Sequence, residues 1–418
     1  IGGGKNSSGA TNVNISGGEV HASTDYGNGG AAIGGGEQSE GAAKVNISGG
    51  EVHASTDYGN GGAGIGGGEQ SKGATTIDIS GNAQVSANGS DGAAIGSGES
   101  STGAATINIS GDAQVSANGS NGAAIGSGKD SSGETNIDIT GAALVSANGS
   151  NSAGIGSGSS SSGETTINIH DTAEGKGVQR AFSSSGAGIG SGSYASGKTH
   201  IAIDHASVST LGNFPATADS SGAGIGTGYA SSSDADITIT ESTVNADGGT
   251  SAAIGSGNQS KGSTVIHITN SDVTATARHG TGIGSGSNSS GKTTIDISGG
   301  TVTAKGGASG FNGSAGIGSG SHSTGDTHIT LRDGVTVEAT GGGDSSRGGG
   351  GGAGIGSGSD ANGNTTILIE GAAKVTATGG STAAGIGSGH YVGDINDPSV
   401  GSTTITIRNS DDGRVIPI

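Results

Sequence analysis

The chain has 418 residues, of which 95 are glycine, and it contains no cysteine, methionine or tryptophan. Glycine at this level without a three-residue period excludes collagen, and the lack of cysteine excludes a disulfide scaffold and thiolate metal sites. The formal charge of −19 argues against nucleic-acid partners and against anionic membranes, both of which need basic surfaces. No apolar run approaches the roughly 20 residues of a membrane helix, so we expect no membrane insertion.

A glycine-rich tetrad, Ile-Gly-(Gly/Ser/Thr)-Gly, recurs along the whole chain at spacings of 29 to 38 residues. It begins at Ile1, Ile33, Ile65, Ile95, Ile125, Ile155, Ile189, Ile225, Ile254, Ile283, Ile317, Ile355 and Ile386. The first two repeats, Val13–Ser39 and Val45–Ser71, differ at a single position. A fixed period of this length is typical of repeat architectures, in which each unit buries its apolar face against its neighbours.

Each repeat contains three short segments with strand character. The first contains the tetrad, as at Gly92–Gly98; the second alternates polar and apolar residues, as at Thr166–Ile169; the third follows a turn, as at Val115–Asn118. Alternation with a period of two predicts a strand with one buried face. No stretch has a helical period.

These segments predict an all-β fold, a right-handed parallel β-helix (β-solenoid) of about 13 coils with roughly 30–38 residues and three short strands per coil. Residues 1–418 would form a single domain, with irregular central coils at 155–282. Both ends lack an obvious capping element, so we expect a segment of a longer protein, and end-to-end self-association is a further hypothesis.

The pattern Gly-Ala-Gly-Ile-Gly-Ser-Gly followed by Thr-Thr-Ile-x-Ile-Ser-Gly-Gly-x-Val-x-Ala resembles Gly-rich repeats in large surface proteins of Gram-positive and gut bacteria. Gly282–Ala304 is a good example. The resemblance covers essentially the whole chain and implies an adhesin-like, extracellular protein of the bacterial cell surface that touches glycans or polysaccharides. It specifies a coil and not a catalytic site.

The departures from the repeat in the central coils are the best pointers to a site. Residues 170–182 are interpreted as replacing the third strand of coil six. Tyr194 and Tyr229 occupy nearly the same place in adjacent coils, so we expect them to lie near one another. Aromatic faces beside hydrogen-bonding groups are typical of a sugar-binding groove. The residues assigned to glycan binding are Tyr194, Tyr229, Phe182, Phe214 and Arg180. Alternatively, the longer loops simply fold their aromatic side chains into small satellite cores.

Three carboxylates of the central coils, Asp204, Asp234 and Asp236, favour a second hypothesis. Hydrolysis of a glycosidic bond needs two carboxyl groups about 5–10 Å apart, and neighbouring coils supply such distances. The alternative function is therefore a polysaccharide-degrading glycoside hydrolase or lyase, although the sequence leans against an enzyme. A purely structural, filament-forming repeat protein is the third alternative.

One outward position is occupied by Asn or Asp in six successive coils, at Asn14, Asn46, Asp78, Asn108, Asp138 and Asn168. Stacked amides can hydrogen-bond from coil to coil, so a structural row is the preferred interpretation. Calcium is a weak alternative, because oxygen ligands suit it, and otherwise no cofactor is expected. His21 and His53 should stack as a pair; two histidines alone do not make a metal site.

Overall fold

The computed structural model describes residues 1–25, 27, 29–211, 221–309, 312–343, 350–390, 401–408 and 414–417. They form two compact units. Unit 1 comprises Ile1–Val208 with Ser231–Ser233, and unit 2 comprises Ser209–Ala230 with Asp234–Ile418. The described residues contain strands and turns but no helix, and hence no helix suited to crossing a membrane. That residues 1–418 form one domain stays a prediction.

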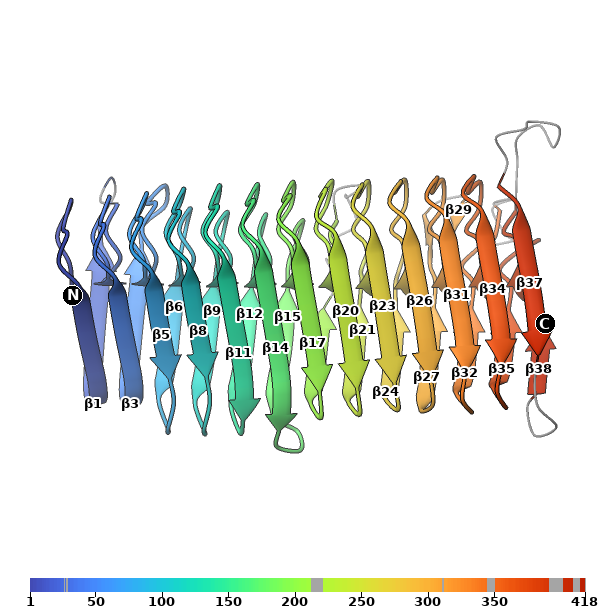
Figure 1. Cartoon of the computed structure of the whole chain (residues 1–418), viewed down its shortest axis with the longest axis horizontal. Coiled ribbons are helices and arrows are strands. Elements are labelled where there is room, and N and C mark those ends of the chain that lie inside the picture. Colours follow the sequence, from blue (N-terminus) through green and yellow to red (C-terminus); the bar gives the residue numbers. More distant parts are fainter. Residues whose placement is uncertain are drawn as a thin grey trace. The chain divides into compact units, whose positions relative to one another are not determined.

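In unit 1 each turn of the chain contains a tetrad strand, a second strand and a third strand, in the order predicted. Figure 1 labels the second and third strands of successive turns. The tetrad strands are β2 (Ile33–Gly34), β4 (Ile65–Gly66), β7 (Ile95–Gly96), β10 (Ile125–Gly126), β13 (Ile155–Gly156) and β16 (Ile189–Gly190). The second strands are β5 (Thr75–Ile79), β8 (Ala105–Ile109), β11 (Thr135–Gly141), β14 (Thr165–Thr172) and β17 (Thr199–Asp204). The third strands are β6 (Gln84–Asn88), β9 (Gln114–Asn118), β12 (Leu144–Asn148) and β15 (Gly177–Phe182). In β1 (Thr11–Thr24) and β3 (Ala43–Thr56) the second and third strands are continuous.

Unit 2 repeats this arrangement, and the chain enters it within β18 (Ser207–Leu211). Its tetrad strands are β19 (Ile225–Gly226), β22 (Ile254–Gly255), β25 (Ile283–Gly284), β30 (Ile317–Gly318), β33 (Ile355–Gly356) and β36 (Ile386–Gly387). Its second strands are β20 (Ala235–Thr240), β23 (Thr264–Thr269), β26 (Thr293–Ser298), β31 (Thr327–Arg332), β34 (Thr365–Glu370) and β37 (Thr403–Arg408). Its third strands are β21 (Thr243–Asp247), β24 (Asp272–Thr276), β27 (Thr301–Lys305), β32 (Thr336–Thr340), β35 (Lys374–Thr378) and β38 (Arg414–Pro417). A short antiparallel pair, β28 (Ala308–Ser309) and β29 (Asn312–Gly313), interrupts one turn.

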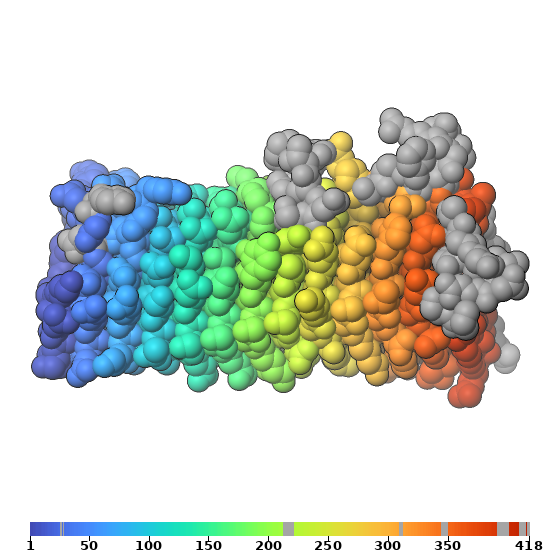
Figure 2. Space-filling view, turned by 90° about the horizontal axis from the view of Figure 1, so that it is seen from above, coloured from blue at the N-terminus to red at the C-terminus, as the bar shows by residue number. Residues whose placement is uncertain are grey.

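Equivalent strands pair in parallel from one coil to the next, so each residue lies beside its counterpart in the repeat. Ile77 pairs with Ile107 and Ile107 with Ile137, and these side chains are at most 1% exposed. Burying each such isoleucine contributes roughly 1.5–3 kcal/mol. A narrow core of stacked Ile, Val and Ala therefore runs through each unit. Figure 2 shows the successive coils of unit 1 as closely packed parallel ridges.

The tetrad is glycine-rich because neighbouring coils approach each other through the backbone there. Gly96 has a φ of 145°, and a Cβ atom at this residue would lie 1.8 Å from the carbonyl oxygen of Gly126. No L-residue with a side chain tolerates both the backbone conformation and the contact. The tetrad is thus a requirement of coil stacking.

The predicted parallel β-solenoid is confirmed, with about 11 complete turns in place of 13 coils. The number of tetrads therefore overestimates the number of turns. The prediction that residues 170–182 replace the third strand is wrong. The third strand is present as β15, in which Val178 pairs with Val145 and Ala181 with Ala147. Residues 173–176, between β14 and β15, form the turn that precedes the third strand.

Candidate functional site

The outward face of the third strands in unit 1 holds a shallow groove of about 480 Å³. Its floor is a row of serines, Ser86, Ser116 and Ser146, which lie beside one another in the parallel register. The residue before each inward valine forms one wall, and here the row consists of Gln84, Gln114 and Leu144. Small hydroxyl side chains between longer ones make this face concave.

The opposite side of the floor is bordered by a row of asparagines. The Asn118 amide donates to the Asn88 side-chain oxygen at 3.0 Å, and the Asn148 amide donates to Asn118, also at 3.0 Å. The next position in register is Phe182, which offers no amide. The Asn148 oxygen is accordingly buried without a hydrogen-bond partner among the described residues. The row fixes the orientation of the amides along the border of the floor.

A pair of histidines stands at one end of the serine row. His53 pairs in register with Ser86 and stacks on His21, with ring centroids 4.7 Å apart and planes 12° apart. The predicted stack is confirmed. Each imidazole contacts the glutamate two residues earlier on its own strand, His53 with Glu51 at 3.0 Å and His21 with Glu19 at 2.7 Å. This end of the groove therefore carries both carboxylates and imidazoles.

A β-bulge in β15 forms the other end. Val145 pairs with Val178 and Ser146 with Arg180, which leaves Gln179 as an extra residue. Gln179 and Arg180 are both exposed, whereas Val178 and Ala181 remain in the core. The Arg180 guanidinium carbon lies 5.6 Å from the centroid of the Phe182 ring, a cation–π arrangement. A bulge redirects side chains in this way without breaking the inward pattern.

Unit 2 has a groove at the same place in its own repeats. It has a volume of about 550 Å³ and lies along the third strands β21, β24 and β27. Its floor row is Asn245, Thr274 and Thr303 in register. The side chain before the inward valine is a carboxylate in one coil, at Asp272. Hydroxyl and amide groups thus dominate this face in each unit.

Comparison with known families finds a match for part of the chain. Six segments of the chain match the model described as beta helix repeat: residues 13–37, 45–69, 107–129, 237–258, 295–321 and 367–390. Each runs from a second strand through a third strand to a tetrad. These six segments are similar to the beta helix repeat. No curated protein and no solved structure matches it.

The structure places the predicted glycan-binding residues at different parts of the coil. Gln179 lines the bulge end of the groove in unit 1, and Arg180 and Phe182 lie next to it, in register with Ser146 and Asn148. Tyr194 is in the turn after a tetrad of unit 1, 60% exposed and with a φ of 58°. In unit 2 that strained turn position belongs to Ala230, with a φ of 49°, and not to Tyr229. The two tyrosines therefore occupy different positions of the repeat. Tyr229 donates to Gln259 at 3.1 Å, and Phe214 lies outside the described residues.

Two of the three predicted carboxylates lie on second strands, and the third, Asp234, lies just before one. Asp204 ends β17, where it contacts His205 at 3.0 Å and pairs in register with His170. Asp234 accepts a hydrogen bond from the backbone of Ser263 at 2.7 Å, just before β20, and Asp236 follows within that strand. None of the three lines the groove in either unit.

His170 lies between two carboxylates on the second-strand side of unit 1. Its Nε2 is 3.0 Å from Asp138 and its Nδ1 is 3.1 Å from Asp171. The hydrogen bond to Asp171, and after it the bond to Asp138, raises the pKa of His170, while partial burial opposes the shift. Both ring nitrogens donate when the imidazole is protonated.

We expect the contribution of His170 to stability to decrease as the pH rises. Because its pKa is higher in the folded state, the stabilisation is fully present below about pH 6.5, the ordinary value for histidine, and is lost as the pH rises through the folded-state pKa. The side chain is 37% exposed, so screening limits the effect to under about 1 kcal/mol. The measurement is the difference in melting temperature between the wild type and His170→Gln from pH 5 to 8.5. A difference that is constant, or that grows with pH, would contradict this assignment.

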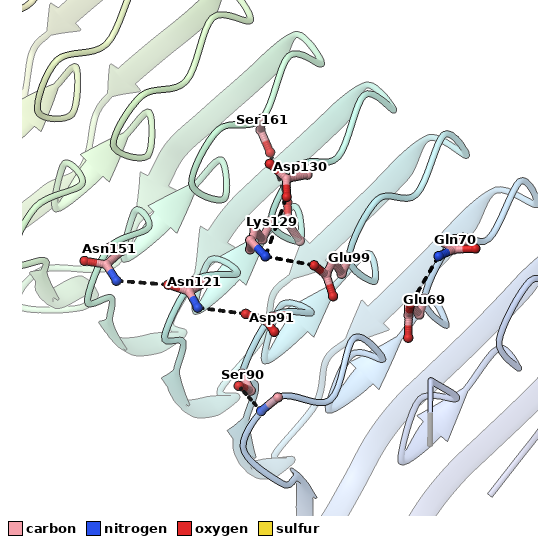
Figure 3. Close-up of polar contacts among 12 residues, drawn as sticks. Glu69, Gln70, Ser90, Asp91, Glu99, Asn121, Lys129, Asp130, Asn151 and Ser161 are labelled. Atoms are coloured by element: carbon pink, nitrogen blue, oxygen red, sulfur yellow. Dashed lines mark hydrogen bonds and ion pairs between the residues drawn. The ribbon is translucent and has the colours of Figure 1, made fainter. Parts of the chain in front are cut away.

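A second polar cluster lies where the turns before and after the tetrads meet (Figure 3). Burial, followed by the charges of Glu99 and Glu37, raises the pKa of Glu69. Lys129 lies 3.0 Å from Glu99 and neutralises part of this charge. Beside them Asn121 donates to Asp91 at 2.7 Å. Among the described residues no three or more His, Asp or Glu side chains are arranged to hold a metal ion.

The row of Asn and Asp on the second strands hydrogen-bonds from coil to coil, as the structural interpretation predicts. Asn46 donates to Asn14 at 2.6 Å, and Asn108 donates to Asp78 at 2.7 Å. Asp138, in contrast, contacts His170 from the next coil. These bonds use the oxygens that a calcium ion would need.

Sequence reasoning missed the serine floor and the bulge. Both leave a signal in the repeat. The Val-Ser-Ala order recurs at Val85, Val115 and Val145, which places small hydroxyls in one row. In the next coil two residues instead of one separate Val178 from Ala181, and this extra residue indicates a bulge.

Proposed function

We propose that the chain is a rigid repeat module of an extracellular bacterial surface protein, and that unit 1 binds a glycan chain along the groove of its third strands. The observation that carries the proposal is the serine floor, with Ser86, Ser116 and Ser146 in register between rows of amide side chains. Successive coils repeat these groups about every 4.8 Å. A polymer of hydroxylated rings is a ligand with a comparable repeat along its length.

The chemistry of the groove suits an uncharged stretch of such a polymer. Serine, glutamine and asparagine side chains both donate and accept hydrogen bonds, as sugar hydroxyls do. Leu144 on the wall and Phe182 beside the floor supply apolar surface for the C–H faces of sugar rings. The floor has no charged group between His53 and Arg180. Binding along it should therefore depend little on ionic strength.

The groove favours binding over catalysis. Its lining includes one carboxylate, Glu51, and that group contacts His53. Acid–base cleavage of a glycosidic bond needs two carboxyl groups on opposite sides of the bond. The alternative of a hydrolase or lyase rests on another place, where Asp204 contacts His205 and lies in register with His170.

The experiment is a glycan array that includes mucin-type and plant polysaccharides, followed by product analysis on every glycan retained. We expect neutral glycans to be retained without released products, at similar strength in 0.05 and 0.5 M salt. Cleavage that is abolished by Asp204→Asn would instead identify an enzyme. No retention on any glycan would overturn the binding proposal and favour a purely structural, filament-forming protein.

A further inference from the structure

The bulge in β15 places a cation at the end of an uncharged row. Arg180 occupies the position of the floor serines, since it pairs in register with Ser146. Its side chain is exposed, and no carboxylate lies within ion-pairing distance of it among the described residues. The regular Val-Ser-Ala order would put a serine here. The guanidinium can therefore form an ion pair with a ligand that lies along the floor.

Phe182 holds this guanidinium in place from the same face of the strand. The guanidinium carbon lies 5.6 Å from the ring centroid, which restricts the long side chain while leaving its N–H edge free to donate. The ring also follows Asn148 in register, so the border of amides ends where the aromatic face begins. Next to the end of the groove, which Gln179 lines, the coil therefore offers an apolar face and a fork of donors side by side.

A guanidinium with a free edge matches a carboxylate or sulfate through two parallel hydrogen bonds, and such charge-assisted bonds are roughly twice as strong as neutral ones. The opposite end of the floor, about 19 Å away over four coil spacings, carries the carboxylates of Glu51 and Glu19 beside the histidines. An anionic group would be repelled there. The charge therefore distinguishes the two ends of the groove.

The net charge limits how many anionic groups the ligand carries. The chain has a formal charge of −19, so a polyanion would be repelled along most of its length. A single anionic sugar at one end gains the contact with Arg180 while the remaining uncharged sugars follow the serine floor. Such a ligand differs from a glycan in which every sugar carries a charge.

We propose that the Arg180 end of the groove selects glycans whose terminal sugar carries an anionic group, a carboxylate or a sulfate ester. The inference rests on the proposed function, because it assumes that the serine floor holds the neutral part of the same chain. It adds a direction to the bound glycan, with the anionic terminus at β15 and the neutral part running toward β3.

Calorimetry tests the selection with four probes: a neutral oligosaccharide retained on the array, the same oligosaccharide ending in a carboxylated sugar, its counterpart ending in a sulfated sugar, and a polyuronate of equal length. The quantity compared is the ratio of affinities between each anionic probe and the neutral one. We expect a ratio of about ten for an anionic terminus at low salt, falling as salt screens the contact. Arg180→Gln should bring the ratio close to one. Lys198→Gln, which removes the same charge from an exposed turn of unit 1, should leave it unchanged.

A preference for either terminal anion that disappears in Arg180→Gln supports the proposal and identifies the anionic group. A preference that persists in Arg180→Gln, equal binding of all four probes, or tightest binding of the polyuronate would overturn it. If no probe binds at all, the proposed function fails instead. Neither residue contributes a buried side chain, so we expect both variants to fold. Their melting curves check this.

Discussion

Replacing Gly96 by alanine is expected to destabilise unit 1 by on the order of 3–5 kcal/mol, at the upper end of single-substitution effects. The new Cβ atom would lie 1.8 Å from the Gly126 carbonyl oxygen, at a φ of 145°. The two coils would have to separate, which would lengthen the backbone hydrogen bond from Ser97 to the Gly126 carbonyl, now 3.1 Å. Because each coil contacts only its neighbours, the damage would interrupt the stacked core at that point.

The measurement is the urea midpoint and the pattern of limited proteolysis of Gly96→Ala. Gly17→Ala is the matched control, since an added Cβ there meets no atom within 4 Å, and it should change stability by no more than about 0.5 kcal/mol. New cleavage sites near β7 and β10 are expected only in Gly96→Ala. Equal behaviour of the two variants would contradict the account of the tetrad as a close backbone contact.

Ser116→Trp is expected to reduce glycan affinity by at least about tenfold. Ser116 is the middle residue of the floor and its side chain points away from the core. An indole there would fill the concave space between the Gln114 and Asn118 rows without disturbing Val115 or Ala117, which are buried on the other side of the strand. The substitution would displace the sugar rings from the centre of the groove, where substitutions in a binding surface have their largest effects on affinity.

The control for this substitution is Thr106→Trp. Thr106 lies in the same coil but on the second strand β8, between the buried residues Ala105 and Ile107, with its side chain directed outward. Affinity is measured with the glycan that the array retains most strongly. Equal loss in both variants would indicate a general structural effect, and unchanged binding by Ser116→Trp would exclude the groove as the binding site.

The fold could be predicted from the sequence because each physical requirement of a solenoid recurs at a fixed place in the repeat. The alternation around Ile77 and Ile107 requires a strand with one buried face, and the glycines of the tetrad require close backbone approach. Thirteen repetitions make an accidental pattern implausible. The number of turns is smaller than the number of tetrads, so periodicity alone does not give the turn count.

The site could be predicted less well, because the positions of its side chains depend on the pairing register between neighbouring coils. The aromatic residues of the central coils suggest a binding site because aromatic side chains are rare in this chain. However, Tyr194 occupies a turn position of positive φ and Tyr229 a different position in the repeat. The residue types of Phe182 and Arg180 suggest binding, but their positions, in register with Asn148 and Ser146, depend on one inserted residue. A single serine does not indicate a binding site. The parallel pairing that places Ser86, Ser116 and Ser146 side by side is what forms the floor of the groove.

The most direct test of the account is a crystal structure of the chain with the most strongly retained oligosaccharide. The account predicts density for the sugar rings along Ser86, Ser116 and Ser146, with hydroxyl contacts to the flanking Gln and Asn rows and the chain end beside Arg180. Sugar bound instead at the second strands near Asp204, or at the turns that carry Tyr194, would contradict the assignment of the groove as the glycan site.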